Sequence, residues 1–211
     1  MKVVIEHFFS YPVAIIDIGQ TLKKLFEYER KNAKWVENVH EHCHKNYQSE
    51  SVNVLKNYPE EHAFLQHCAE LYKNEIFKWD SIPLKITTSW LTKTEQNGFS
   101  KPHSHKNSLI SGVAYDEGNG FTKGLTGELF FHSPKPQPIL PCSPSSFTHE
   151  NCTHYSILPM PNHLVLFESS LSHHIGKHLE EEPRISLAFN TFPDGEIGAY
   201  DSSMFVKIGK D

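Results

Sequence analysis

Short segments of alternating apolar and polar residues fill the chain after Pro83, and they constrain the fold more than any other feature. In residues 84–90, Leu, Ile, Thr and Trp alternate with Lys, Thr and Ser. This alternation is typical of a β-strand with one buried face. Similar strands are expected at 108–115, 127–132, 163–168 and 184–192, and a turn at 96–98. Because Gly- and Pro-bearing loops separate the strands, the pattern predicts an antiparallel barrel or sandwich.

The N-terminal part of the chain has a different pattern. Apolar residues at 3–5 and 13–16 favour one or two short strands, and apolar positions in 22–28 and 62–76 recur at helical spacing. Pro59 and the acids after it suit the first turn of the second helix. The polar segment between the helices is expected to be a loop or a weak helix. We therefore predict one domain over 1–211, with a helical part at about 1–80 and a β core at about 84–192.

Composition excludes several classes of protein. The net charge of −5 and the lack of a Lys- and Arg-rich run argue against a nucleic-acid partner, and no apolar run reaches the length of a membrane span. The cysteines form no CxxC pair, and no signal peptide is recognisable, so reduced thiols in a cytoplasm are expected. The cysteines are Cys43, Cys68, Cys142 and Cys152. The Pro- and Ser-rich residues 133–161 are interpreted as an active-site cover or substrate loop.

Histidine is the unusual residue, with 15 in the chain, so only spacing can identify a site. His103 and His105 are two apart in an expected extended segment, where both side chains point to one face. Both could then reach one metal ion, although a chance pair is the simpler explanation. His173 and His174 follow the apolar residues 164–167, and in extended backbone they point to opposite faces.

Arg184 is a lone charge at the start of an otherwise apolar strand. A buried arginine is costly unless an anion meets it. Either the residue lies at an exposed strand end beside the glutamates of 180–182, or it forms a fork that binds the carboxylate of a small diacid.

The order of these residues resembles the motif of the 2-oxoglutarate- and iron(II)-dependent oxygenases, which is His-x-Asp/Glu, a distal His, and an Arg about ten residues later. Here His103-Ser104-His105 is followed by His173 and, eleven positions on, by Arg184-Ile185-Ser186. The sequence is most similar to a subgroup found in bacteria and phages. Its further marks here are Trp90, Ser-Gly-x-x-Tyr at 111–115, Leu-x-x-Phe-x-Ser at 164–169 and Arg-Ile-Ser-Leu-Ala-Phe-Asn at 184–190.

The resemblance covers about residues 84–192. It implies a mainly β fold, a double-stranded β-helix of the jelly-roll or cupin-like type, with N-terminal packing helices. It also implies iron(II) on His103, His105 and His173, and 2-oxoglutarate with its far carboxylate on Arg184 and Ser186. No catalytic residue beyond the metal centre is expected. Dioxygen and a peptide, amino-acid or small-molecule substrate would react there, with hydroxylation and release of succinate and CO2. The expected compartment is the cytoplasm, of the cell or of a phage host.

One departure from the general motif leaves alternatives open, because His105 stands where Asp or Glu is expected. His105 can replace the carboxylate and give a three-histidine site, which we favour because neutral imidazole suits iron. Alternatively, His105 is the first ligand and Asn107 occupies the third-ligand position, or Asp116 or Glu117 reaches in. Two other functions compete: a cupin-type three-histidine dioxygenase without 2-oxoglutarate, and a non-catalytic β-fold binding module.

Overall fold

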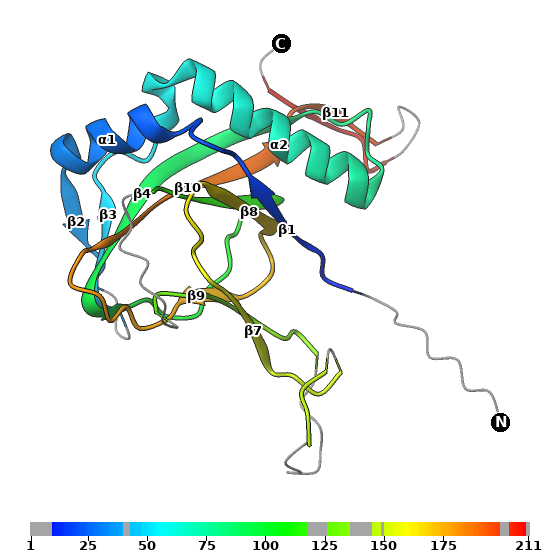
Figure 1. The fold of residues 1–211 in the computed structure, drawn as a ribbon. Helices are drawn as coiled ribbons and strands as arrows, with labels where there is room; N and C mark the ends of the chain where they lie inside the picture. Colours follow the sequence, from blue (N-terminus) through cyan, green and yellow to red (C-terminus); the bar gives the residue numbers. More distant parts are fainter. Residues whose placement is uncertain are drawn as a thin grey trace.

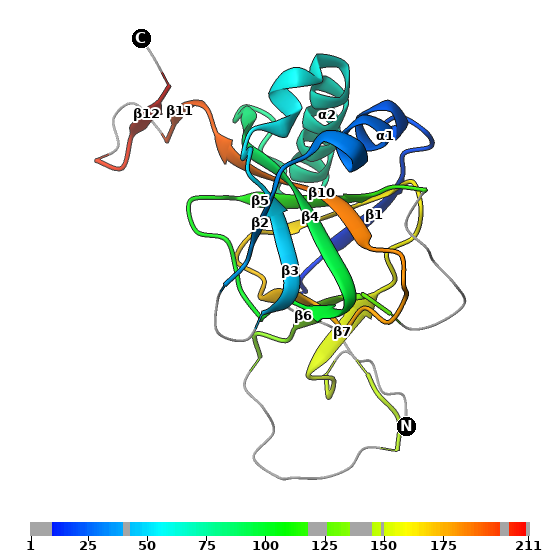
Figure 2. The ribbon, with the colours of Figure 1, turned by 90° about the vertical axis from the view of Figure 1, so that its left-hand side faces the viewer.

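The computed structural model describes residues 10–39, 43–117, 126–135, 145–148, 150–198 and 203–209. Two antiparallel sheets form the body of the protein, and two helices cover the outer face of the larger one (Figures 1 and 2). No helix in these residues is long and apolar enough to cross a membrane. The fold is the mainly β one that the resemblance implied, with packing helices from the N-terminal part.

The larger sheet has seven strands in the order β1-β8-β5-β10-β4-β3-β2. The strands are β1 (Val13–Asp17), β8 (His163–Glu168), β5 (Ile110–Tyr115), β10 (Arg184–Pro193), β4 (Leu84–Phe99), β3 (His44–Ser49) and β2 (Trp35–Glu37). Strand β10 lies in the middle and pairs with β5 on one side and β4 on the other. Residues far apart in the chain therefore meet on this strand.

The smaller sheet has the order β7-β6-β9, with β7 (His154–Ile157), β6 (Leu129–His132) and β9 (His173–Ile175). It lies below the larger sheet in Figure 2. Apolar side chains from both sheets pack between them, including Phe131 and Phe167, whose ring centroids are 4.9 Å apart. The two sheets thus form a sandwich with a shared interior.

The helices pack on the other face of the larger sheet. Helix α1 (Lys23–Asn32) contributes Leu25 and Phe26, and α2 (Pro59–Phe77) contributes Leu65 and Ala69, to a core that also contains Leu91. The short 3-10 helix η1 (Val54–Asn57) precedes α2. The predicted start of the second helix at Pro59 is confirmed.

The alternating side chains of strand β10 face two different environments. Ile185, Leu187 and Phe189 belong to the core under the helices, whereas Arg184 and Ser186 line a pocket between the sheets. The period of two along a strand explains this division, because successive side chains point to opposite faces. One strand therefore supplies both core packing and site residues.

Two local predictions were wrong. The polar segment between the helices, expected to be a loop or weak helix, forms β2 and β3, which extend the sheet beyond β4. The turn expected at 96–98 is absent, because β4 continues to Phe99. Asn97 has a φ of +66°, and a Cβ on Gly98 would lie 2.6 Å from the carbonyl oxygen of Lys45. These turn-favouring residues instead accommodate an irregular pairing with β3.

Several expectations concern residues outside the described part. The possible strand at 3–5 lies there, as do residues 136–144 and 149 of the Pro- and Ser-rich segment. The described remainder of that segment includes β7, a strand that the sequence pattern does not predict. At the C-terminal end, β11 (Gly195–Ile197) and β12 (Val206–Ile208) form a separate hairpin.

Candidate metal centre and anion pocket

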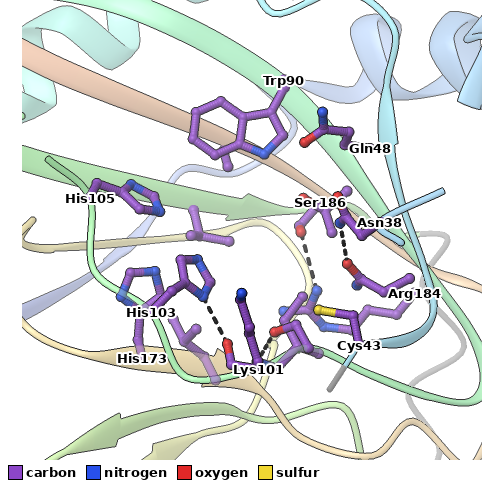
Figure 3. A pocket seen from close by; sticks show the side chains of 17 residues that line it. Asn38, Cys43, Gln48, Trp90, Lys101, His103, His105, His173, Arg184 and Ser186 are labelled. Carbon is purple, nitrogen blue, oxygen red and sulfur yellow. Dashed lines mark hydrogen bonds between the residues drawn. The ribbon is translucent and has the colours of Figure 1, made fainter. Parts of the chain in front are cut away.

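His103, His105 and His173 come together at one edge of the sandwich (Figure 3). One ring nitrogen of each lies within 4.8 Å of one from each of the others, a spacing that one metal ion could bridge. Backbone hydrogen bonds hold the segments in place. The amide of His103 donates to the carbonyl of His173 at 3.0 Å, and the amide of His173 donates back at 2.8 Å. An antiparallel β-bridge thus brings together His103 and His173, which are seventy positions apart in the chain.

Each of the three imidazoles has its Nδ1 atom occupied. Nδ1 of His103 is 2.9 Å from the carbonyl oxygen of Lys101, and Nδ1 of His173 is 2.9 Å from that of Leu171. Nδ1 of His105 is 2.6 Å from Oδ1 of Asn190. An oxygen of this kind only accepts, so each Nδ1 carries the proton. The Nε2 atom of each ring therefore keeps a free lone pair that can bind a metal.

Behind His105 lies a network of hydroxyl groups. Ser111 Oγ is 3.0 Å from Nδ1 of His105 and donates to Asn190 Oδ1 at 2.8 Å. Ser169 Oγ is 2.8 Å from Ser111 Oγ and 2.6 Å from Ser108 Oγ. This network fixes the ring of His105 and leaves its Nδ1 no freedom to act as a ligand.

Burial favours the neutral form of His105 and His173. Desolvation, helped by the nearby His103, lowers the pKa of His173 to about 3. Desolvation also lowers the pKa of His105, more than the hydrogen bond to Asn190 raises it. Neutral imidazole is the form that binds a metal, so the chemistry of this donor set fits iron(II) or another transition metal.

Arg184, the first residue of β10, lines the same cavity as the three histidines. It is almost fully buried, with 1% of its surface exposed. Its NH1 donates to Ser186 Oγ at 3.2 Å and its NH2 to the Tyr115 hydroxyl at 3.3 Å, while its Nε has no partner in the described residues. None of these groups is an anion. Burial lowers the pKa of Arg184, which records the cost of enclosing this charge. An anionic ligand at this position would offset that cost.

A cavity of about 380 Å³ joins the histidines to the arginine. Trp90, Val113, Leu129, Ile175 and Ala188 give it apolar walls, and Asn38, Cys43, Asn46 and Gln48 line the side formed by β3 and the residues between β2 and β3. The amides of this wall are functional candidates that the sequence analysis misses. Their segment is polar and lacks the apolar alternation of a strand, so no sequence pattern predicts that these residues lie beside the site.

The alternatives raised by the sequence lie elsewhere. Asp116 pairs with Arg30 at 2.7 Å, and Glu117 accepts hydrogen bonds from Gln20 and Asn162. Asn107 is exposed and is not among the residues that line the cavity. His174 occupies the opposite face of β9, where its Nδ1 is 2.9 Å from Nε2 of His132.

Comparisons with known proteins show what the sequence and the fold are similar to. Residues 88–190 match the model of a family described as "Putative 2OG-Fe(II) oxygenase". This part of the chain, just under half of its length, is therefore similar to the 2-oxoglutarate- and iron(II)-dependent oxygenases, a family whose description implies iron(II) and 2-oxoglutarate as cofactors. No curated protein matches the sequence.

Solved structures share the fold at low sequence identity. A prolyl-4-hydroxylase from Pseudomonas putida aligns with a TM-score of 0.59 and 12% identity, over 88% of this chain and 95% of that one. HygX from Streptomyces hygroscopicus, with nickel and 2-oxoglutarate bound, aligns at 0.56 and 12%, over 93% and 92%. The epimerase SnoN from nogalamycin biosynthesis aligns at 0.60 and 11%, over 90% and 80%.

Proposed function

We propose that this chain is a dioxygenase that hydroxylates a peptide, amino acid or small molecule and converts 2-oxoglutarate and dioxygen to succinate and CO2. His103, His105 and His173 would hold iron(II), and Arg184 and Ser186 would hold the far carboxylate of 2-oxoglutarate. The observation that carries the proposal is the shared cavity, which joins a cluster of imidazoles to a buried arginine that has no anionic partner in the part of the chain that the structure describes.

The choice of His105 as third ligand follows from its hydrogen bonds. A metal-binding histidine usually donates its second ring N–H to an oxygen acceptor, which fixes the tautomer. Asn190 provides that acceptor for His105, as backbone carbonyls do for His103 and His173. Asp116 is already paired with Arg30, so it does not compete for the metal.

The choice of Arg184 as the carboxylate anchor follows from its burial. Among the described residues its guanidinium group donates to the hydroxyls of Ser186 and Tyr115 and lies 5.1 Å from the centroid of the Tyr115 ring, and none of these groups is an anion. A carboxylate accepting two parallel N–H bonds is the usual partner of a guanidinium group. The Ser186 hydroxyl, two residues along the same face of β10, is placed to donate a further hydrogen bond to that carboxylate.

When bound, iron(II) and 2-oxoglutarate supply the activation of dioxygen and the oxidation of an unactivated C–H bond. The residues of the chain orient and enclose the reactants. The three histidines would hold the metal at the wall of the cavity, and the space beside them could admit small ligands. Arg184 sets the direction of the co-substrate across the cavity, and the apolar walls at Val113, Leu129 and Ile175 limit the access of water.

A three-histidine dioxygenase that needs no keto acid is the competing enzyme class. It would use the same imidazoles, but it gives no reason for a buried Arg184 in the same cavity that meets no carboxylate among the described residues. The similar structures named as a prolyl-4-hydroxylase and as an epimerase differ widely in substrate, so a peptide and a small molecule both stay within the proposal.

Anaerobic titration of the apo-protein with iron(II) and then 2-oxoglutarate tests this function. We expect the weak visible charge-transfer band of the iron–keto-acid complex in the native protein. His173→Ala should abolish the band and Arg184→Ala should weaken it. His174→Ala is the matched control, because this neighbour lies on the opposite face of β9, and it should keep the band. A folded native protein without the band would contradict the proposal, and its iron content would then separate the two alternatives.

A further inference from the structure

Lys101 has two separate relations to the site. Its carbonyl oxygen accepts the hydrogen bond from Nδ1 of His103 at 2.9 Å. Its side chain lines the cavity and points into it in Figure 3. No carboxylate of the described residues lies within ion-pair distance of its ammonium group, in contrast to Lys73 and Lys93, which pair with Glu70 and Glu95.

The charges around the cavity are all of one sign. The lining residues that the structure describes include two basic side chains, Lys101 and Arg184, and no aspartate or glutamate. The whole chain nevertheless carries an excess of acids, with a net charge of −5. The positive character is therefore local to this cavity.

The proposed cofactors do not remove this excess. The two negative charges of 2-oxoglutarate offset those of iron(II), and three neutral imidazoles add none. A carboxylate ligand to the metal would have offset the positive charge of Arg184, but the neutral His105 stands in that position. Loaded with metal and co-substrate, the cavity keeps the charges of both Arg184 and Lys101. In a partly buried site such a field is screened less than in bulk water and attracts anions.

We propose that the substrate is a small molecule with an oxyanion group, a carboxylate or a phosphate, and that Lys101 binds this group beside the metal. The inference rests on the proposed function and adds the substrate class. An ammonium group acts as a point charge that suits either oxyanion. Gln48 and Trp90 line the same cavity and offer an amide and an aromatic surface to the neutral part of the molecule.

Matched pairs of small molecules test the role of this charge even while the substrate is unidentified. The probes are acetate and acetamide, benzoate and benzamide, and phenyl phosphate, added to protein loaded anaerobically with iron(II) and saturating 2-oxoglutarate. The thermal unfolding midpoint and the charge-transfer band are recorded in each case. We expect benzoate or phenyl phosphate to raise the midpoint and perturb the band at concentrations roughly tenfold below those of benzamide.

Three variants locate the effect. Lys101→Gln should reduce this anion preference by about tenfold, and Lys101→Arg should restore part of it. Lys106→Gln is the control, because this exposed lysine lies in the same segment but outside the cavity lining, and it should keep the preference. A preference for benzoate but not phenyl phosphate would assign a carboxylate, and the reverse a phosphate.

Other outcomes overturn the proposal. Equal responses to charged and neutral probes, or no response to any of them, would remove the anion site. Loss of the charge-transfer band in Lys101→Gln would place Lys101 in the co-substrate site instead. Absence of the band in the native protein is a failure of the proposed function itself, and the oxyanion site would fall with it.

Discussion

His105 donates its Nδ1 proton to Oδ1 of Asn190 across 2.6 Å, a contact between residues 85 positions apart in the chain. The histidine stands where the general oxygenase motif has a carboxylate, and the asparagine closes the apolar run of β10. This hydrogen bond sets which nitrogen of His105 faces the cavity. The departure from the motif is therefore accompanied by a side chain that makes histidine usable as a ligand.

We predict that Asn190→Leu lowers iron(II) affinity about 10- to 100-fold, because His105 loses the acceptor that fixes its tautomer. Asn190→Asp keeps an acceptor at the same position and should stay close to the native affinity. Competition titration with a chromogenic chelator measures both. Native-like affinity in a folded Asn190→Leu protein would show that His105 is not held through this bond.

We predict that Arg184→Met separates stability from co-substrate binding. Without 2-oxoglutarate, the variant should unfold at the same or a higher urea concentration than the native protein, because an unpaired buried charge is removed. With nickel(II) and 2-oxoglutarate at 100 times its dissociation constant, the native protein should gain about 2.7 kcal/mol of stability. The variant keeps its histidines, so it should retain the gain from nickel(II) and gain far less from 2-oxoglutarate. An equal gain in both proteins would place the carboxylate elsewhere.

Stability of the metal-free protein should depend on pH through the buried His173 and the partly buried His174. Burial lowers the pKa of His173 to about 3 and that of His174 to about 4, below the value near 6.5 of an unfolded chain. Between these values the unfolded state binds more protons than the folded state, so the free energy of unfolding falls as the pH falls. The slope well inside this window is about 1.4 kcal/mol per pH unit for each histidine.

Urea unfolding of the apo-protein at pH 7, 6 and 5 measures this dependence. His173→Gln should flatten it, because the contribution of this imidazole is then absent. A native curve that gains stability as the pH falls from 7 to 5 would contradict the neutral state assigned to the buried imidazoles.

Gly112→Ala should destabilise the protein by about 1–3 kcal/mol through overpacking. Gly112 faces Phe189 across the β5–β10 pair, and an added Cβ would lie 2.3 Å from its ring, which is fully buried. Denaturant unfolding gives the value. The double variant with Phe189→Leu should recover part of the loss. Additive losses in the double variant would show that the contact is not the cause.

Sequence alone predicted the parts of the molecule whose period is regular. The alternation in β4 and β10 and the start of α2 at Pro59 are local patterns, and the structure confirms them. The resemblance to the oxygenase motif named the three histidines that the fold brings together. It could do so because the order of motif residues along a chain survives large changes in the residues between them.

The other parts depend on contacts that no local pattern records. Strand β3 has polar residues on both faces. Its buried Asn46 donates a hydrogen bond to Thr94 and does not pack against apolar groups. Its residues therefore read as a loop, and the amide wall of the cavity was missed. The Gln-Asn-Gly triplet at 96–98 favours a turn locally, but pairing with β3 keeps β4 extended past it.

The paired backbone hydrogen bonds between His103 and His173 hold two of the proposed ligands together without any metal. Folding, rather than metal entry, then supplies the entropy of bringing the donors together, so the site is preorganised and different divalent ions would meet nearly the same imidazoles. Such a site ranks metals by the Irving–Williams order, in which nickel and copper bind more tightly than iron. Selection of iron would then depend on which ions the cell supplies, and the purified protein should take up whichever late transition metal is offered in excess.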